Sequence, residues 1–525
     1  MTKLLNHINT YQSEADYQND KSKNFPNVSY IIENDNVLFV KEKTDYSNDY
    51  LTFVALEDST FKLTSNAVNY SLDDGQTWTA LASGTASPTV TAGNKIMWKG
   101  ELTPNSSVGI GKFSATANFN VQGNIMSLLF GDDFTNQTDL TGKDYAFYNL
   151  FHQNTNIKSA KNLILPATKL ADSCYGSMFN GCTSLVNAPQ LPATTLATYC
   201  YDGMFYGCTS LVTAPQLPAT TLASNCYSRM FQYCTILTSA PVLPATILAS
   251  GCYESMFNGC TSLTTAPTLP ATTLANRCYE TMFNGCTSLV NAPELPATTL
   301  TTYCYNGMFY GCTSLVTAPT LPATTLKYCC YNDMFNSCTS LTTAPELPAT
   351  TLAEGCYSQM FRGCTSLTSA PVLPATTLAD NCYSGMFRDC TGLTTAPVLP
   401  ATTLASYCYN GIFRGCTGLT TAPELPATTL ARECYNSIFF GCTGLTSAPV
   451  LPATTLAYGC YAYMFYYCTK LSYIKCLATD ISASNCLTYW VENVASSGTF
   501  VKNSVATWNV TGVNGVPTGW YVVTE

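Results

Sequence analysis

Cysteine is the residue in this chain whose number and spacing could do chemistry. Its 27 thiols would suit metal ligation, disulfide formation or redox exchange. Twelve of them recur every 26 residues from Cys174, and a second series recurs with the same step from Cys182. The two series are related as Cys-x7-Cys, whereas zinc sites use Cys-x2-Cys pairs or nearby histidines. The two histidines, His7 and His152, lie outside both series, so the spacing predicts no metal site and no cofactor.

A thiol is also a small apolar group that tolerates complete burial. The N-terminus lacks the pattern of a secretory signal, which favours reduced cysteines. We therefore expect two ladders of free thiols inside the protein. Disulfides between neighbouring repeats, and metal or redox chemistry, are the alternatives. Cys329 precedes Cys330 and breaks the pattern once, so we expect it to be the most exposed and reactive thiol.

Carboxylates could also do chemistry, but their arrangement does not favour catalysis. General acid–base or nucleophilic catalysis needs groups that act together. Glu294, Glu346 and Glu424 occur singly at one repeat offset, where other copies carry Val, Thr or Gln. A solvated rim is the simpler interpretation. We predict no catalytic residue and expect that the protein is not an enzyme.

A 26-residue repeat indicates the element that positions these side chains. Repeats of 20–50 residues bury their apolar faces by stacking on their neighbours, which makes a solenoid. The unit Leu191–Gln216 reads LPATTLATYCYDGMFYGCTSLVTAPQ. Leu196, Cys200 and Met204 follow the spacing of one helix face, and Gly207 is suited to a left-handed helix end. The Val-Thr-Ala run that follows predicts a very short strand, because prolines border it.

The repeat resembles the BspA-like leucine-rich repeats over about residues 170–486. The residues that carry the resemblance form F-x-x-C-x-x-L-x-x-A-P-x-L-P, as in Phe283, Cys286, Leu289, Ala292, Pro293, Leu295 and Pro296. The period predicts twelve 26-residue coils, each with a short helix and a short strand, and the resemblance implies that they form an α/β leucine-rich-repeat solenoid, although the usual unit of that family is about 23 residues long. It also implies a role in adhesion or surface recognition.

Offsets that vary from copy to copy are candidate contact positions, because a stacked core fixes the others. One series of variable residues follows the Ala-Pro pair: Gln190, Gln216, Val242, Thr268, Glu294, Thr320, Glu346, Val372, Val398, Glu424 and Val450. A second set comprises Tyr199, Tyr206, Tyr303 and Tyr310. These tyrosines would stack on a sugar or a protein, or they would serve as partly buried spacers.

The sequence divides into four predicted regions. Residues 1–48 are expected to contain a helical leader and a hairpin, and to dock on another virion protein or a symmetry mate. A β-sandwich is predicted at 49–142, the solenoid with its capping coil at 143–487, and a β cap at 488–525. The stretch Ser71–Trp78 resembles the Asp-box of sialidases, which in that family is a structural hairpin.

The net charge and the lack of long apolar stretches limit the kinds of partner that the protein is expected to bind. The net charge of −9 and pI near 4.8 argue against nucleic acid as a ligand, and no stretch is apolar for long enough to insert in a membrane. The leader, the Asp-box region and the Gly-Trp tail resemble structural proteins of gut bacteria and their phages. We therefore expect a phage virion fibre or decoration protein whose solenoid binds a host surface protein or glycan. A bacterial cell-surface adhesin and an intracellular scaffold are the alternatives, and homo-oligomerisation stays open.

Overall fold

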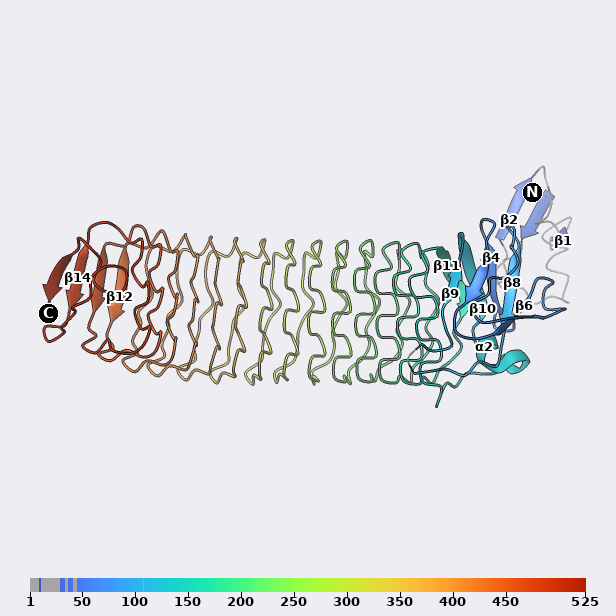
Figure 1. The fold of residues 1–525 in the computed structure, drawn as a ribbon, viewed down its shortest axis with the longest axis horizontal. Coiled ribbons are helices and arrows are strands. Elements are labelled where there is room, and N and C mark those ends of the chain that lie inside the picture. The colour runs from blue at the N-terminus through green and yellow to red at the C-terminus, as the bar shows by residue number, and fades with distance from the viewer. Residues whose placement is uncertain (1–8, 11–28, 34–35, 41–44, 107) are drawn as a thin grey trace.

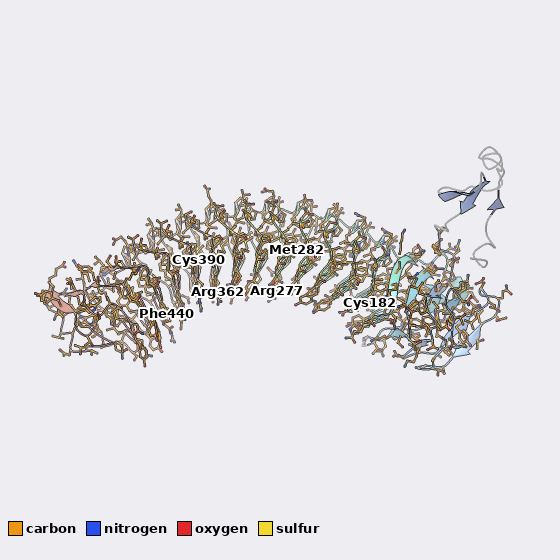
Figure 2. All side chains as sticks on the ribbon, turned by 90° about the horizontal axis from the view of Figure 1, so that it is seen from above. Cys182, Arg277, Met282, Arg362, Cys390 and Phe440 are labelled. Carbon is orange, nitrogen blue, oxygen red and sulfur yellow. The ribbon has the colours of Figure 1, made fainter. Side chains whose placement is uncertain are left out.

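The computed structural model describes residues 9–10, 29–33, 36–40, 45–106 and 108–525. Most of the chain forms one long stack of similar coils, with a region of β-sheet at its N-terminal end and short parallel strands at its C-terminal end (Figure 1). Seen from the perpendicular direction, the stack bends into an arc (Figure 2). The expected solenoid is therefore confirmed, whereas the helix expected in each coil is wrong.

The described residues between 51 and 164 form two sheets. The six-stranded sheet has the order β11-β10-β4-β8-β6-β7, and a two-stranded sheet pairs β5 with β9. The bounds are β4 Leu51–Ala55, β5 Phe61–Leu63, β6 Val68–Ser71, β7 Thr79–Leu81, β8 Lys95–Lys99, β9 Phe113–Ala115, β10 Phe119–Asn124 and β11 Ile157–Ile164. A one-turn helix, α2 Ser127–Phe130, and a 3-10 turn at Gly131–Asp133 follow β10.

This sheet region continues directly into the solenoid. Strand β10 pairs in parallel with β11, and Ser159 of β11 bridges in parallel to Asn187 of the next coil. Phe53 contacts Phe113 at 4.9 Å between ring centroids and Phe151 at 5.9 Å. Because Phe151 begins the phenylalanine column of the solenoid, one hydrophobic core runs from the sheets into the coils.

The Asp-box is a structural hairpin, as predicted. Strands β6 and β7 are antiparallel on either side of it. Asp73 accepts hydrogen bonds from the hydroxyl of Thr77 at 2.6 Å and from its amide at 2.9 Å, and the Ser71 hydroxyl donates to it at 2.7 Å. These bonds lower the pKa of Asp73 to about 2. The indole N–H of Trp78 donates a hydrogen bond to the Gly75 carbonyl, which closes the turn.

A run of tight turns replaces the predicted helix in every coil. The residues at positive φ come every four positions, as at Tyr199, Gly203 and Gly207, so Gly207 is left-handed as expected. Each left-handed residue ends one four-residue turn and starts the next. An α-helix has 3.6 residues per turn. Residues spaced by four would therefore shift gradually around the surface of a helix, whereas in four-residue turns they all point inward. The Cys200 and Met204 spacing is common to both, which is why the helix prediction failed.

The turns let the backbone join neighbouring coils. Along residues 200–208, even-numbered amides donate within their own turn, as from Met204 to the Tyr201 carbonyl at 3.1 Å. Odd-numbered amides donate to the next coil, as from Phe205 to the Met230 carbonyl at 2.9 Å. A helix would keep all these bonds within itself and leave only side chains to hold the stack. The alternation satisfies the buried backbone while linking each coil to the next.

Columns of equivalent inward side chains fill the stack. Tyrosine rings from Tyr175 to Tyr461 stack at 5.6 to 6.4 Å between centroids, and a parallel phenylalanine column begins at Phe151. From Cys182 onward, each second-series thiol donates to the carbonyl of the phenylalanine 29 or 31 residues earlier, as from Cys208 Sγ to Phe179 O at 3.2 Å. Burial within a thiol ladder is therefore confirmed, and the thiol also makes a hydrogen bond.

The segment with the prolines carries little regular strand. Neighbouring coils meet there through isolated parallel bridges, such as Asn187 to Thr213 and Lys169 to Thr195. Proline lacks the amide hydrogen that a sheet needs, which keeps the pairing this short. Continuous strands return at the C-terminal end as a parallel sheet in chain order: β12 Ser447–Leu451, β13 Tyr473–Cys476, β14 Thr499–Lys502 and β15 Tyr521–Thr524.

The start of the chain contains the expected hairpin. Strands β2 Ser29–Glu33 and β3 Asn36–Val40 are antiparallel, and β1 Asn9–Thr10 pairs with β3. Of the predicted helical leader the structure describes Asn9–Thr10, which are in strand β1, and the rest lies outside the described residues. Among the residues that the structure describes, no helix has the length and apolar character to cross a membrane.

Candidate functional site

The variable series after the Ala-Pro pair forms a continuous exposed stripe on the proline segment. All eleven residues from Gln190 to Val450 are exposed. Val372 and Val398 are 78% and 76% exposed, which is unusual for valine in a folded protein. Neighbouring stripe residues also touch, since the Thr320 hydroxyl donates to Glu294 Oε2 at 3.2 Å. The structure thus brings the predicted contact residues into one row, although it does not test what they bind.

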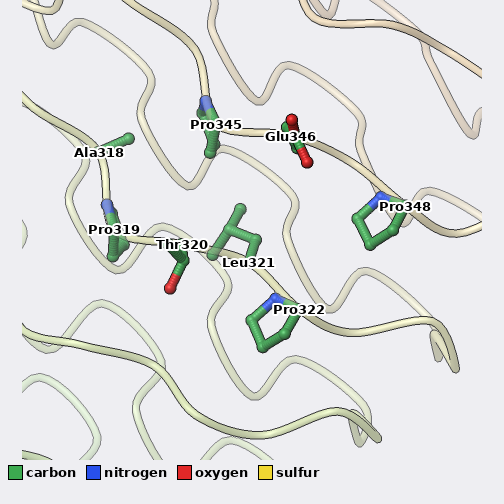
Figure 3. Close-up of a pocket in the computed structure, with 8 residues that line it drawn as sticks. All are labelled: Ala318, Pro319, Thr320, Leu321, Pro322, Pro345, Glu346 and Pro348. Atoms are coloured by element: carbon green, nitrogen blue, oxygen red, sulfur yellow. The ribbon is translucent and has the colours of Figure 1, made fainter.

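Shallow grooves lie between successive coils along this stripe. The one in Figure 3 has a volume of about 350 Å³ and is lined by Ala318, Pro319, Thr320, Leu321, Pro322, Pro345, Glu346 and Pro348. Equivalent grooves of about 280 and 370 Å³ open beside Thr268 and Val372. We call this series the proline grooves. Each presents proline rings and two variable side chains, one from each coil, and this arrangement suits binding by contact and not catalysis.

The four predicted tyrosines lie on the run of turns, a different segment of the coil. Tyr199 and Tyr310 are 42% and 39% exposed, and Tyr206 and Tyr303 are partly buried. The Tyr303 ring lies between the Arg277 guanidinium at 4.8 Å and the Tyr328 ring at 5.2 Å. The inward columns separate these tyrosines from the proline grooves. The two predicted sets are therefore two surfaces and do not make one site.

The outer surface of the turns carries most of the charged side chains of the repeats. Figure 2 shows Arg277, Arg362 and Phe440 toward the inner edge of the arc, with Met282 and Cys390 in its body. Arg277 pairs with Glu280 at 3.1 Å. In this N-terminal half Arg229 also pairs, with Asp202 at 2.8 Å, and burial raises the pKa of Asp202 although Arg229 opposes the shift.

The sequence analysis missed one feature of this surface. Arg362, Arg388 and Arg414 occupy the same offset in three successive coils, and Phe440 follows at that offset in the fourth. The signal was available in the sequence as three arginines at intervals of 26. The same offset holds Tyr206 and Tyr310, which the sequence analysis names as candidate contact residues, but it does not single out the arginines.

The thiols are poorly placed for reaction. All 27 cysteines lie in the described residues and are free, and all except Cys329 are buried. Burial raises the pKa of Cys312 to about 12 and also raises that of Cys329. Cys329 is thus the most exposed thiol, as predicted, but its thiolate is disfavoured. Within the described part of the chain, no group of three or more His, Cys, Asp and Glu side chains is arranged to hold a metal ion.

Comparison with known families agrees with this geometry. Residues 143–289, 253–394 and 384–489 match the family described as BspA type leucine rich repeat region (6 copies), and together these ranges cover well over half of the chain. The chain belongs to the BspA-type leucine-rich repeat family. Members of this family are typically not enzymes, so a BspA-type solenoid is expected to bind rather than to catalyse. No curated protein matches the chain.

The BspA-type assignment accounts for both exposed surfaces. Its repeat fixes the inward Tyr, Phe, Cys and Leu columns and leaves the outward offsets free to differ between coils. Nothing in the fold or the family match supports a phage origin, and the virion placement stays a prediction from the sequence.

Proposed function

We propose that this BspA-type protein is a non-catalytic adhesin of the bacterial cell surface. Its solenoid binds a surface-attached protein or glycan of a host through side chains that point away from the core. The observation that supports this most strongly is the row of proline grooves. It places exposed, variable side chains at regular intervals along a rigid stack, and extended repeat surfaces are suited to binding large partners.

The exposed valines of the stripe support contact with a macromolecule. Val242, Val372 and Val398 are 62%, 78% and 76% exposed and each adjoins prolines. Apolar side chains gathered on a surface indicate an interaction site when they lie together. Glu294, Glu346 and Glu424 lie in the same row and add carboxylates to it.

Attachment at the N-terminus is a separate part of the proposal. Most of residues 1–48 lies outside the described residues, and the proposal of docking through this segment rests on its sequence alone. The same holds for assembly with a second copy.

The experiment measures binding of the labelled full chain to epithelial cells and to mucin-coated surfaces. The test variant carries Val372→Lys and Val398→Lys, and the matched control carries Val505→Lys, because Val505 is 75% exposed and lies after the last repeat. We expect at least tenfold weaker binding for the test variant and unchanged binding for the control. Equal binding by both variants, or no binding by the unmodified chain, would overturn the proposal.

A further inference from the structure

Three arginines on successive coils form a ladder on the surface of the turns. The phenylalanines that precede Arg362, Arg388 and Arg414 stack on one another at 5.7 and 6.0 Å. The Gly363 amide donates to the Arg388 carbonyl at 2.8 Å, and the Asp389 amide donates to the Arg414 carbonyl at 2.6 Å. The three side chains therefore leave the backbone in register, one coil apart. We call them the arginine ladder.

The ladder has few partners of its own. Arg388 Nε lies 3.4 Å from Asp389 Oδ2, but without hydrogen-bond geometry, so the buried Nε–H has no acceptor. Arg362 donates to the Gln359 side-chain oxygen at 2.9 Å. Among the described residues, neither Arg362 nor Arg414 makes a salt bridge. In the N-terminal half, by contrast, Arg229 and Arg277 each have a carboxylate partner.

The positive charges of the ladder are only partly neutralised by nearby carboxylates. Burial, followed by repulsion from Arg388, lowers the pKa of Arg414, and Asp389 opposes the shift. Asp333 lies close enough to Arg362 for the guanidinium to lower the pKa of the Asp333 carboxyl against the rise that burial causes, and Asp333 accepts hydrogen bonds from Asn332 and Asn336. Planar guanidinium groups bind carboxylates and sulfates through paired hydrogen bonds.

Aromatic rings extend the ladder toward the C-terminus. The Arg414 guanidinium lies 4.0 Å from the centre of the Phe440 ring, and Phe440 stacks on Tyr466 at 4.7 Å. Tyr466 contacts Tyr467, which is 47% exposed. A linear ligand along this row would meet three cations and then the edge of Phe440, whose faces are covered by Arg414 and Tyr466, followed by the exposed Tyr467. Anionic sugars offer both the charge and the apolar C–H groups that such a row would contact.

The backbone beneath the ladder favours a ligand that contacts side chains only. Its amides donate either within their own turn or to the next coil, as those of Gly363 and Asp389 do. A peptide bound by strand addition would need free backbone groups at an edge. An acidic peptide would therefore rely on its carboxylates and would leave the aromatic end of the row unused.

We propose that the arginine ladder, together with Phe440 and Tyr466, is a binding site for a linear anionic glycan that carries carboxylate or sulfate groups. This inference names a ligand class for the turn surface and rests on the proposed adhesive function. It is independent of the proline grooves, which lie on another segment of the coil. The overall net charge of −9 does not oppose it, because the ladder concentrates positive charge locally.

The test measures affinity of the full chain for four probes of matched length. These are oligogalacturonate, its methyl ester, sulfated dextran and polyglutamate. We expect binding to oligogalacturonate or sulfated dextran, or to both, with the pair showing which anion is preferred. Binding should weaken as salt rises. Equal binding of the methyl ester, or polyglutamate binding as tight as the better glycan, would overturn the proposal; the latter outcome assigns an acidic peptide.

Variants of the full chain locate the site. Arg388→Gln combined with Arg414→Gln should weaken glycan binding at least tenfold, and Arg414→Lys should have an intermediate effect because it keeps the charge but loses the planar fork. Arg277→Gln is the matched control, since Arg277 is exposed on the same surface and already paired. An equal loss in this control would refute the site. Cell binding that persists when every glycan probe fails would refute this inference and leave the adhesin proposal standing.

Discussion

The buried thiol ladder predicts that the site of Cys312 tolerates a smaller side chain but not a large charged one. Its side chain is 0% exposed, and its Sγ donates to the Phe283 carbonyl at 3.1 Å. Cys312→Ala removes one buried sulfur, at about 1 kcal/mol for the lost burial, and one weak hydrogen bond, at about 0.5–1 kcal/mol. We therefore expect a loss of about 1–2 kcal/mol in local stability.

Cys312→Arg places a long charged side chain in a space that holds one sulfur. Cys312 lies close enough to the thiols of Cys286 and Cys338, in the coils on either side, to raise their pKa values, so those two coils leave no open space for the added atoms. Overpacking combined with an unpaired buried charge should cost more than about 4 kcal/mol.

The assay is hydrogen exchange of backbone amides in the full chain, because unfolding of long repeat arrays is not reliably two-state. The amides of Phe309 and Gly311 report directly, since they donate to the Met334 and Asn336 carbonyls of the next coil. We expect slightly faster exchange in the Ala variant and local loss of protection in the Arg variant. Equal protection in the two variants would refute the packing argument.

Three further predictions follow from the fold. A maleimide should label Cys329 first and few other thiols in the native protein, and mass spectrometry that finds most of the 27 cysteines modified would contradict the ladder. Because burial raises the thiol pKa from 9.0 to about 12 at Cys174 and Cys312, their stabilisation should be complete below about pH 9 and lost as pH rises through 12. Circular dichroism during alkaline titration measures this, and an unchanged spectrum up to pH 12 would contradict it. Deleting residues 1–44 should leave a folded chain with the Asn124 to Ser47 bond intact but without its attachment to a cell or particle; normal attachment would show that docking lies elsewhere.

The sequence predicted the stacking because periodicity is a direct signal of it. The 26-residue step specified the repeat, and the inward positions of Cys200, Met204 and Leu211 were recognisable from their apolar character. The local conformation was not specified in the same way. Spacing of i, i+4 and i+8 fits a helix face and a series of four-residue turns equally over so short a run. The left-handed Tyr199 decides between them, and tyrosine gives little indication of that conformation.

The candidate surfaces were predictable to different extents. The exposed stripe from Gln190 to Val450 could be found because its residues vary where a core position would not. The grooves beside it could not, since they arise from prolines of two adjacent coils. The arginine ladder could not be predicted as a site from the sequence. Its recognition depends on tertiary contacts, which place Arg362, Arg388 and Arg414 in register and leave the outer two without a salt bridge.

Footprinting of the bound protein tests the central claim most directly. The claim is that outward side chains of a BspA-type solenoid form the working surface of this protein. Hydroxyl-radical modification of the full chain would be compared free and bound to mucin-coated surfaces. The account predicts protection at exposed solenoid residues such as Val372 and Val398, with no change at Val505. Protection confined to the N-terminal sheets, with both solenoid valines modified as in the free protein, would contradict it.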